Sequence, residues 1–408
     1  MKTRQRTSIA HISKVHQFHP MPSHSKLLMF SSYNYRPRWL WSVLLLTIWG
    51  NMALTRQVGR PESSEPVQHL TSARANLTPG TLSLDAVGDI LLDRGVAAQI
   101  QQYGMGYPFQ QTRSLLSAAD IAFGNLECPL ATHGVKVHKK FCFKPDPATV
   151  KCLTGAGMDV LSLANNHSMD CGRIGLDETM ATLRANGLHW CGAGENLAGA
   201  EQPTVLNIKG VKVAFVGFCQ FLPEGSFLRD DAPTIAFASE EAVRRAVSVA
   251  RQQADVVIAS FHWGEEYYSL PHENQVQLAH AAVAAGADLV LGHHPHVFQA
   301  LEVVKHQVGG HPRRALIAYS LGNFVFDAPR AWDSHTAETF ILHCTLNRNG
   351  LVAAQAWPIY IGKCCPRPAT GAQAQAILAR LTELSRARHT MLRAGQVSLT
   401  SKLPEIRQ

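Results

Sequence analysis

Short apolar runs typical of β-strands alternate with longer stretches of helical period from Thr81 onward, and this alternation limits the possible folds more than any other feature. The predicted strands are Ser83 to Gly88, Ile121 to Gly124, Val160 to Ala164, Val211 to Phe218, Val256 to Phe261, Leu289 to Gly292, Leu316 to Ser320 and Phe340 to Leu346. The predicted helices are Pro147 to Ala156, Gly175 to Asn186, Glu240 to Gln253 and Glu273 to Ala285. Strands and helices in alternation predict an α/β sheet protein.

The end of the chain has a different pattern. Predicted strands beyond Val297 have no helices between them, so we expect them to pair as antiparallel hairpins. A last helix is predicted from Gln373 to Arg388, packed on the outside. These patterns divide the chain into a basic tail with a signal or anchor segment (1–54), a polar linker (55–80), a main domain (81–362) and a C-terminal helical extension (363–408).

Sixteen uncharged residues, Trp39 to Leu54, follow two arginines near the N-terminus. A basic stretch before an apolar one is typical of an export signal, so we expect the rest of the chain to be exported, either anchored to the cell membrane or periplasmic. A bilayer span needs about 20 apolar residues, and Gly50 and Asn51 interrupt this one, so a cleaved signal stays open beside an uncleaved anchor. Translation from Met29 instead of Met1 would give a basic region of ordinary length.

The net charge of +8 is confined to the tail. Residues 1–62 hold nine lysines and arginines against one acid, which leaves 29 basic and 29 acidic residues in 63–408. A neutral folded part lacks the basic surface that a phosphate backbone requires, so we expect no nucleic-acid partner. The nine cysteines form no CxxC pair, which argues against a zinc ribbon or a disulfide framework and favours buried free thiols.

Polar side chains stand directly after five of the apolar runs. Ligands of open α/β sheets bind outside the carboxyl ends of the strands, so we expect these groups to meet at one sheet edge. They are Asp89, Asn125 with Glu127, Asn165-Asn166-His167, His262, and His293-His294-Pro295-His296. Carboxylate, amide and imidazole groups without a thiolate suit a two-metal site for manganese, iron or zinc.

Taken one at a time, these residues also have structural interpretations. Asp89 could cap a helix beginning near Arg94, Asn165 and Asn166 could satisfy the backbone of a turn, and His262 could be a buried, hydrogen-bonded imidazole. Such groups at five strand ends together favour a shared site.

The HHPH run is the strongest local motif. In extended backbone, alternate side chains share a face, so we expect His294 and His296 to point the same way and His293 to face away. Pro295 fixes the local geometry and leaves the choice between His293 and His294 open.

Other polar and aromatic residues have weaker interpretations. Trp263 and Tyr267 could wall a pocket or belong to the core, and the Gly322-Asn323 turn could hold an anion or be an ordinary turn. A basic run is more often a solvated face than an anion site. That run consists of Lys136, Lys139, Lys140 and Lys144.

Six sequence runs, in this order and spacing, resemble the capsule synthesis protein CapA family of poly-γ-glutamate biosynthesis, which is related to calcineurin-like metallophosphoesterases. The runs are AVGDILLDRGV, FGNLECPL, LSLANNHSMDCGRIGLDETMATLRANGLHWCGAGEN, SFHWGEEY, AGADLVLGHHPHVFQALE and IAYSLGNFVFD. The resemblance covers about residues 83–345. It implies a four-layer αββα sandwich of two mixed sheets flanked by helices, with two divalent metal ions at the strand ends.

The resemblance also implies roles for matching residues. His167 would be the general acid, and Asp170 would orient its ring. Glu127 stands where the related phosphoesterases carry a bridging aspartate, and the histidine that usually follows the first aspartate is absent, so the spacing and number of metals stay open. The implied metal ligands are Asp89, Glu127, Asn166, His262, His294 and His296.

The resemblance implies action in the synthesis or export of poly-γ-glutamate or a similar anionic capsule polymer, with membrane polymer-synthase subunits as possible partners. A metal-dependent hydrolase with another substrate and a non-catalytic scaffold that binds polymer are the alternatives. All of them use the same residues, so the sequence leaves the three functions open.

Overall fold

The computed structural model describes residues 80–223, 229–327, 334–400 and 403–406. The predicted signal or anchor segment, the two start positions and nearly all of the predicted linker lie outside the described residues. No helix among the described residues is long and apolar enough to cross a membrane.

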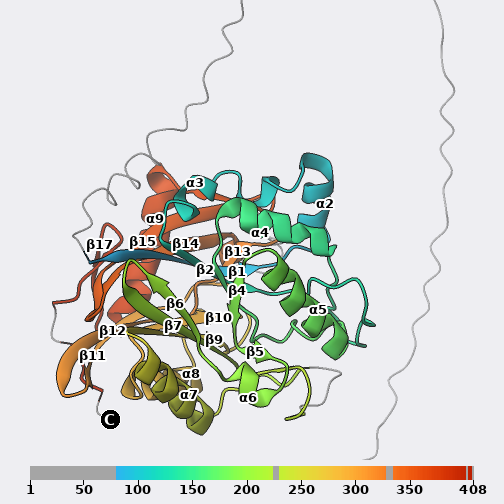
Figure 1. Ribbon diagram of the computed structural model, residues 1–408. Coiled ribbons are helices and arrows are strands. Elements are labelled where there is room, and N and C mark those ends of the chain that lie inside the picture. The colour runs from blue at the N-terminus through green and yellow to red at the C-terminus, as the bar shows by residue number, and fades with distance from the viewer. Residues whose placement is uncertain (1–79, 224–228, 328–333, 401–402, 407–408) are drawn as a thin grey trace, which may run out of the picture. The chain divides into compact units, whose positions relative to one another are not determined.

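Two mixed sheets form the centre of the described part of the chain (Figure 1). In the larger sheet the order is β17-β18-β15-β14-β1-β2-β3-β4, with β13 beside β1 and β16 beside β15. Its strands are β1 (Leu82–Ile90), β2 (Ile121–Leu126), β3 (Val160–Ser162), β4 (His189–Cys191), β13 (Asn323–Val325), β14 (Glu338–Asn347), β15 (Gly350–Gly362), β16 (Cys365–Pro368), β17 (Leu392–Arg393) and β18 (Gln396–Val397).

The smaller sheet has the order β11-β12-β10-β9-β7-β6. Its strands are β6 (Thr204–Ile208), β7 (Val211–Cys219), β9 (Val256–His262), β10 (Leu289–His293), β11 (Leu301–Val308) and β12 (His311–Ala318), and a separate pair is formed by β5 (Ala193–Gly194) and β8 (Thr234–Ile235). The late predicted strands 316–320 and 340–346 both lie in antiparallel hairpins, as β12 and β14, but each pairs with a strand that was not predicted, β11 and β15 respectively. Two late strands also pair in parallel with earlier ones, β12 with β10 and β13 with β1.

Helices cover the outer face of each sheet, so the architecture is the expected four-layer αββα sandwich (Figure 1). The helices on the larger sheet are α2 (Arg94–Tyr103), α4 (Val150–Ala156) and α5 (Gly172–Ala185), and those on the smaller sheet are α7 (Glu240–Gln253) and α8 (Glu273–Ala284). Short helices α3 (Arg113–Leu116) and α6 (Leu197–Ala200) lie in connections. Between the sheets, buried side chains such as Leu84, Phe123, Phe215, Ile258 and Leu291 form the central core.

Helix α7 shows why the sequence predicts these elements well. Ser239 precedes it, and its side chain accepts a hydrogen bond from the backbone N–H of Ala242, as an N-cap does. Val243, Val247 and Ala250 form a buried stripe at helical spacing that packs on the smaller sheet. The observed bounds equal the predicted ones.

The sequence predicted that the C-terminal helix would pack on the outside. The observed helix, α9 (Gly371–Arg386), does not. Ile377 and Leu381 are fully buried in the core between the sheets. The helix contacts β15 of the larger sheet and β11 of the smaller one. Ser385 follows at the same spacing, and its hydroxyl accepts a hydrogen bond from the N–H of Leu301 on β11. The helix therefore closes one side of the sandwich.

Two glycines permit close backbone contact at the strand ends where the polar residues lie. A Cβ atom at Gly88 would lie 1.8 Å from the carbonyl oxygen of Gly322, and one at Gly292 would lie 2.0 Å from that of Tyr319. Such contacts are impossible for any larger residue. Each glycine stands directly before a polar residue, Asp89 and His293 respectively.

Candidate metal centre

The polar groups after the strands of the two sheets meet in one buried cluster. The Nδ2 atom of Asn125, from β2, donates to Oδ1 of Asp89 on β1 at 2.9 Å and lies 3.3 Å from Nδ1 of His262 on β9. Asn165, after β3, donates from Nδ2 to Oδ1 of Asn125 at 3.1 Å. Since β9 belongs to the smaller sheet, these bonds join the carboxyl ends of both sheets.

Three side chains in this cluster are placed to hold a metal ion. Glu127, His294 and His296 each offer a ligand atom, and these atoms lie within 4.8 Å of one another. Both carboxylate oxygens of Glu127 and Nδ1 of His294 are buried without a hydrogen-bond partner among the described residues. Buried polar atoms without partners are costly, and a cation would satisfy them. The residues therefore fit a divalent metal, and carboxylate with imidazole suits manganese, iron or zinc.

The hydrogen bonds of His296 assign which ring nitrogen is open to a ligand. The Nδ2 atom of Asn323 donates to the carbonyl oxygen of Thr336 at 3.1 Å, so Oδ1 of the amide faces the ring. His296 Nδ1 lies 2.9 Å from this oxygen and donates to it. Nε2 is therefore the nitrogen that a metal would take in place of its proton, as in histidines that ligate metals through one nitrogen and are oriented through the other.

The charges around the cluster favour a cation. Burial opposes the charge on His296, but the carboxylates of Glu127 and Asp89 raise its pKa to about 9. Burial, and next the charge of Asp89, raises the pKa of Glu127 well above its usual value. Burial lowers the pKa of His294 to about 3, so this imidazole is neutral. A divalent cation would reverse the effect on Glu127 by compensating its charge.

The backbone of the HHPH run differs from the expectation of extended chain. His294 has φ of 97° and His296 has φ of 59°, both in the left-handed region. Both imidazoles reach the cluster, with ring centroids 5.9 Å apart. His293 stays in strand geometry and faces the core, where its ring lies 6.1 Å from Phe123 and its Nε2 lies 3.4 Å from the carbonyl oxygen of Val87.

Asp89 belongs to the cluster and does not cap a helix. The cap of α2 is Asp93, whose carboxylate accepts from the N–H of Arg94 at 2.7 Å. Asp89 Oδ2 accepts from the N–H of His294 at 3.3 Å and lies 3.5 Å from Nδ1 of His296. Burial opposes its ionisation, but the hydrogen bond and charge of His296 outweigh it and lower the pKa of Asp89.

Asn166 and His262 lie beside the three-residue cluster. His262 Nε2 is 2.8 Å from Oδ1 of Asn166 and 3.6 Å from Oε1 of Glu127. Burial, and then the neighbouring imidazoles, lower the pKa of His262 well below its usual value. Asn165 holds the loop in place, because its Oδ1 accepts from the N–H of His167 at 3.0 Å.

His167 is held by a buried carboxylate. Its Nδ1 lies 2.9 Å from Oδ2 of Asp170, which also accepts from the N–H of Phe143 at 2.6 Å. Lys139 pairs with the other oxygen of Asp170 at 2.5 Å, and its side chain is 3% exposed. Burial lowers the pKa of His167 against the opposing effect of Asp170. The expectation of a solvated face is therefore wrong for Lys139, because its charge is needed beside a buried acid.

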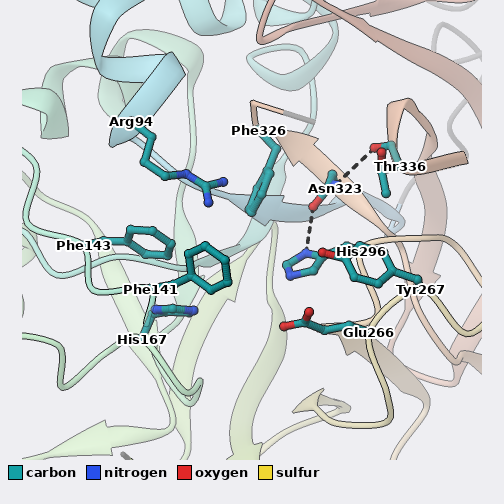
Figure 2. Close-up of a pocket in the computed structure, with 10 residues that line it drawn as sticks. All are labelled: Arg94, Phe141, Phe143, His167, Glu266, Tyr267, His296, Asn323, Phe326 and Thr336. Atoms are coloured by element: carbon teal, nitrogen blue, oxygen red, sulfur yellow. Dashed lines mark hydrogen bonds between the residues drawn. The ribbon is translucent and has the colours of Figure 1, made fainter. Parts of the chain in front are cut away.

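A pocket opens above His167 and His296 (Figure 2). Tyr267 and Asn323 were noted in the sequence and line it, whereas Trp263 is fully buried in the core. Sequence reasoning missed most of the pocket wall. The missed residues are Arg94, Phe141, Phe143, Glu266, Phe326 and Thr336. Arg94 and Glu266 fall within the runs DILLDRGV and SFHWGEEY, which were the only pointers to them.

The fold and the cluster define a class: αββα sandwich proteins with a buried carboxylate and imidazole site at the joined strand ends, fit for a divalent metal. Comparison with known proteins narrows the class. Residues 83–328 match the family model described as bacterial capsule synthesis protein PGA_cap. The chain is 33% identical over 357 residues to the capsule biosynthesis protein CapA of Bacillus anthracis, covering 85% of this chain and 82% of that one. The chain therefore belongs to the bacterial capsule synthesis protein PGA_cap family.

Other proteins are similar over shorter spans. The PGA biosynthesis protein CapA of Bacillus subtilis (strain 168) is 33% identical over 290 residues, 70% of this chain and 73% of its own length. The probable polyglutamine synthesis accessory protein Rv0574c of Mycobacterium tuberculosis is 26% identical and covers 68% of this chain and 77% of its own. The crystal structure of a 5'-nucleotidase precursor from Thermus thermophilus aligns with 74% of this chain and 58% of its own at 12% identity, with a TM-score of 0.41. That last likeness is too distant to carry an argument about function.

Proposed function

We propose that this protein acts in the synthesis or export of poly-γ-glutamate or a similar anionic capsule polymer. In this proposal the chain is exported, tethered by its N-terminal segment, and works beside membrane subunits that make the polymer. The membership of the family supports the polymer, because similar proteins carry names from capsule and PGA biosynthesis. The observation that supports an active site is the cluster of Glu127, His294 and His296 with its unpartnered buried atoms.

Two divalent ions are the cofactors in this proposal. Glu127, His294 and His296 would hold one, and Asp89, Asn166 and His262 would complete a second position beside it. A bound divalent ion lowers the pKa of water to about 7 and polarises a carbonyl or phosphoryl oxygen. The chain's own part is to orient the ring of His167 through Asp170, so that its Nε2 can move a proton at the pocket.

The proposal predicts that a substitution of a metal ligand lowers both the bound metal and the amount of surface polymer. His294→Ala removes one ligand and Glu127→Gln removes the negative charge of another, so we expect metal affinity to fall about tenfold or more. The same variants should fail to restore surface polymer in a capsule-forming host that lacks its own homologue. Metal content is measured on purified protein, and polymer by capsule assay.

His311→Ala is the matched control, because His311 is exposed at the start of β12, away from the carboxyl ends of the strands. It should keep both metal and polymer. Equal, negligible metal in the wild type and in both site variants would contradict the metal centre. Normal polymer with His294→Ala would contradict its role in capsule formation.

A metal-dependent hydrolase with another substrate is the second candidate. The observation that favours it is the buried group of His167, Asp170 and Lys139, since a histidine oriented in this way is suited to proton transfer. A scaffold that only binds polymer has no need of such a group. Turnover assays on phosphodiesters and on γ-linked glutamate polymer separate the two.

A further inference from the structure

Arg94 stands where the pocket and the first helix of the fold meet. Its backbone has φ of 53°, a left-handed conformation that a non-glycine residue rarely adopts. It is the first residue of α2, directly after the cap Asp93. Figure 2 shows its side chain reaching from the helix to the pocket, across from His296 and Glu266.

Three aromatic rings surround the guanidinium group. Its central carbon lies 6.0 Å from the ring centroid of Phe141, 5.0 Å from that of Phe143 and 5.3 Å from that of Phe326. Aromatic faces attract a cation while they exclude water from it. The N–H groups at the edge of the planar group are then its remaining means of interaction.

One edge of the guanidinium is already paired. Its Nη2 atom binds Oδ1 of Asp327, whose Oδ2 accepts from the N–H of Gly95 at 3.2 Å. The Nε atom of Arg94 is buried and has no hydrogen-bond partner among the described residues. A buried donor without an acceptor costs free energy, so the site is built to receive an acceptor from a ligand.

We propose that Arg94 binds a carboxylate of the polymer and thereby places the reacting part of the chain over the cluster of Glu127, His294 and His296. The inference rests on the proposed function and names the group that the pocket recognises. Guanidinium groups match the planar geometry of a carboxylate and hold it through two parallel hydrogen bonds. In poly-γ-glutamate each unit carries one free carboxylate, so each unit offers this group.

The charges of the pocket favour a carboxylate over a phosphate. Among the described residues that line it, Arg94 is the only lysine or arginine. Its charge is shared with Asp327, and Glu266 adds a negative charge to the opposite wall. Arg94, Asp327 and Glu266 together carry a net negative charge, which repels a phosphate dianion about twice as strongly as a carboxylate monoanion.

The size of the pocket points to a small group. Its volume is about 30 Å³, and a water molecule needs about 10 to 15 Å³ by the same measure. A group of the size of a carboxylate fits such a space.

The test compares binding of free and neutralised carboxylates by calorimetry, using the full chain loaded with metal. The probes are a γ-linked glutamate oligomer, a galacturonate oligomer, the amidated form of each, and inorganic phosphate. Arg94→Gln removes the charge, and Arg94→Lys keeps it without the planar fork. We expect both variants to bind the free carboxylate oligomer about 10- to 100-fold more weakly than the wild type, with amidated probes unchanged.

Arg113→Gln serves as the control for loss of one positive charge, because Arg113 is exposed on α3 and is not among the pocket-lining residues. Metal content and melting temperature should be the same in all four proteins, which shows that a loss of binding is not a loss of folding. If Arg94→Gln destabilises the chain, Arg94→Lys still decides the outcome.

The outcomes separate this inference from the proposed function. If wild type and Arg94→Lys bind the γ-linked oligomer equally, the proposed role of Arg94 is wrong, whereas poly-γ-glutamate remains the proposed polymer. If only the galacturonate oligomer binds, and Arg94→Lys weakens this binding, the carboxylate site at Arg94 is supported and the assignment of poly-γ-glutamate as the polymer is wrong. If phosphate binds more tightly than both oligomers, or if amidated probes bind as well as free ones, the carboxylate site is wrong.

Discussion

The residues of the cluster combine backbone strain with unpaired polar atoms. His294 and His296 both adopt positive φ, which costs about 1 to 3 kcal/mol for each non-glycine residue. The buried carboxylate of Glu127 has no hydrogen-bond partner among the described residues, which adds to the cost. Strain and unsatisfied groups at one place are typical of a functional site, because a ligand bound there can offset their free-energy cost.

A variant at His167 distinguishes a hydrolase from a non-catalytic scaffold. We expect His167→Asn to keep the metal and to lower turnover of a substrate with a poor leaving group about 10²- to 10⁴-fold, because proton transfer contributes that much. An activated leaving group that needs no proton should be affected less. Steady-state rates on the two substrates, with metal analysis, measure the difference.

Asp170→Asn is the companion variant, since it loosens the ring of His167 without removing it, and it should give a weaker form of the same pattern. Loss of metal from His167→Asn would show that His167 is a ligand and that its assigned role is wrong. If the wild type binds anionic polymer but turns over no substrate, the hydrolase function is excluded and the non-catalytic scaffold is the remaining candidate.

Particular residues show how far the sequence predicts the site. Asp89, Glu127, His262, His294 and His296 were all expected at strand ends, and the structure brings them together. The buried role of Lys139 and the pocket residues Phe141 and Phe143 were not predicted, because these residues lie on the loop 127–146, which has no period. Their positions follow from packing of that loop against Asp170 and α2, and no local pattern encodes such contacts.

At the scale of elements, the alternating strands and helices were predictable because each buries a full apolar face. The strands β6, β11 and β15 were not predicted. The short strands β4, β5, β8, β13 and β16 to β18 were also missed, since segments of two to four residues carry no clear period. The helix α9 was found, but its place was not. Its apolar residues Ile377 and Leu381 fit an outer surface or a gap between sheets equally well, and only the tertiary fold decides between them.

The position of α9 predicts a large effect on stability. Leu381→Ala should lower the free energy of unfolding by about 2 to 5 kcal/mol, because it leaves a cavity in a core that cannot fully collapse. Gln375→Ala, on the exposed side of the same helix, should change it by less than about 0.5 kcal/mol. Urea denaturation measures both. Similar small effects would mean that the helix lies outside the core.

At the scale of the whole molecule, positive charge and the long apolar run are both concentrated in residues 1–62. Residues 1–62 account for the entire net charge of +8, and the domain that follows is neutral. Basic residues before an apolar segment are typical of export signals, in which the basic residues stay in the cytoplasm and set the orientation of the segment.

Export is therefore expected to depend on the apolar run Trp39 to Leu54. A fusion of residues 29–80 to an export-dependent reporter should be active outside the cytoplasm, and Leu45→Arg, which breaks the apolar run, should abolish this activity. Arg56→Gln, after the run, is the control and should have little effect. Carbonate extraction then distinguishes the two kinds of segment, because an anchor stays with the membrane and a cleaved signal releases a shorter product. A reporter that remains in the cytosol would remove export from the proposed function, and with it any direct contact with polymer at the cell surface.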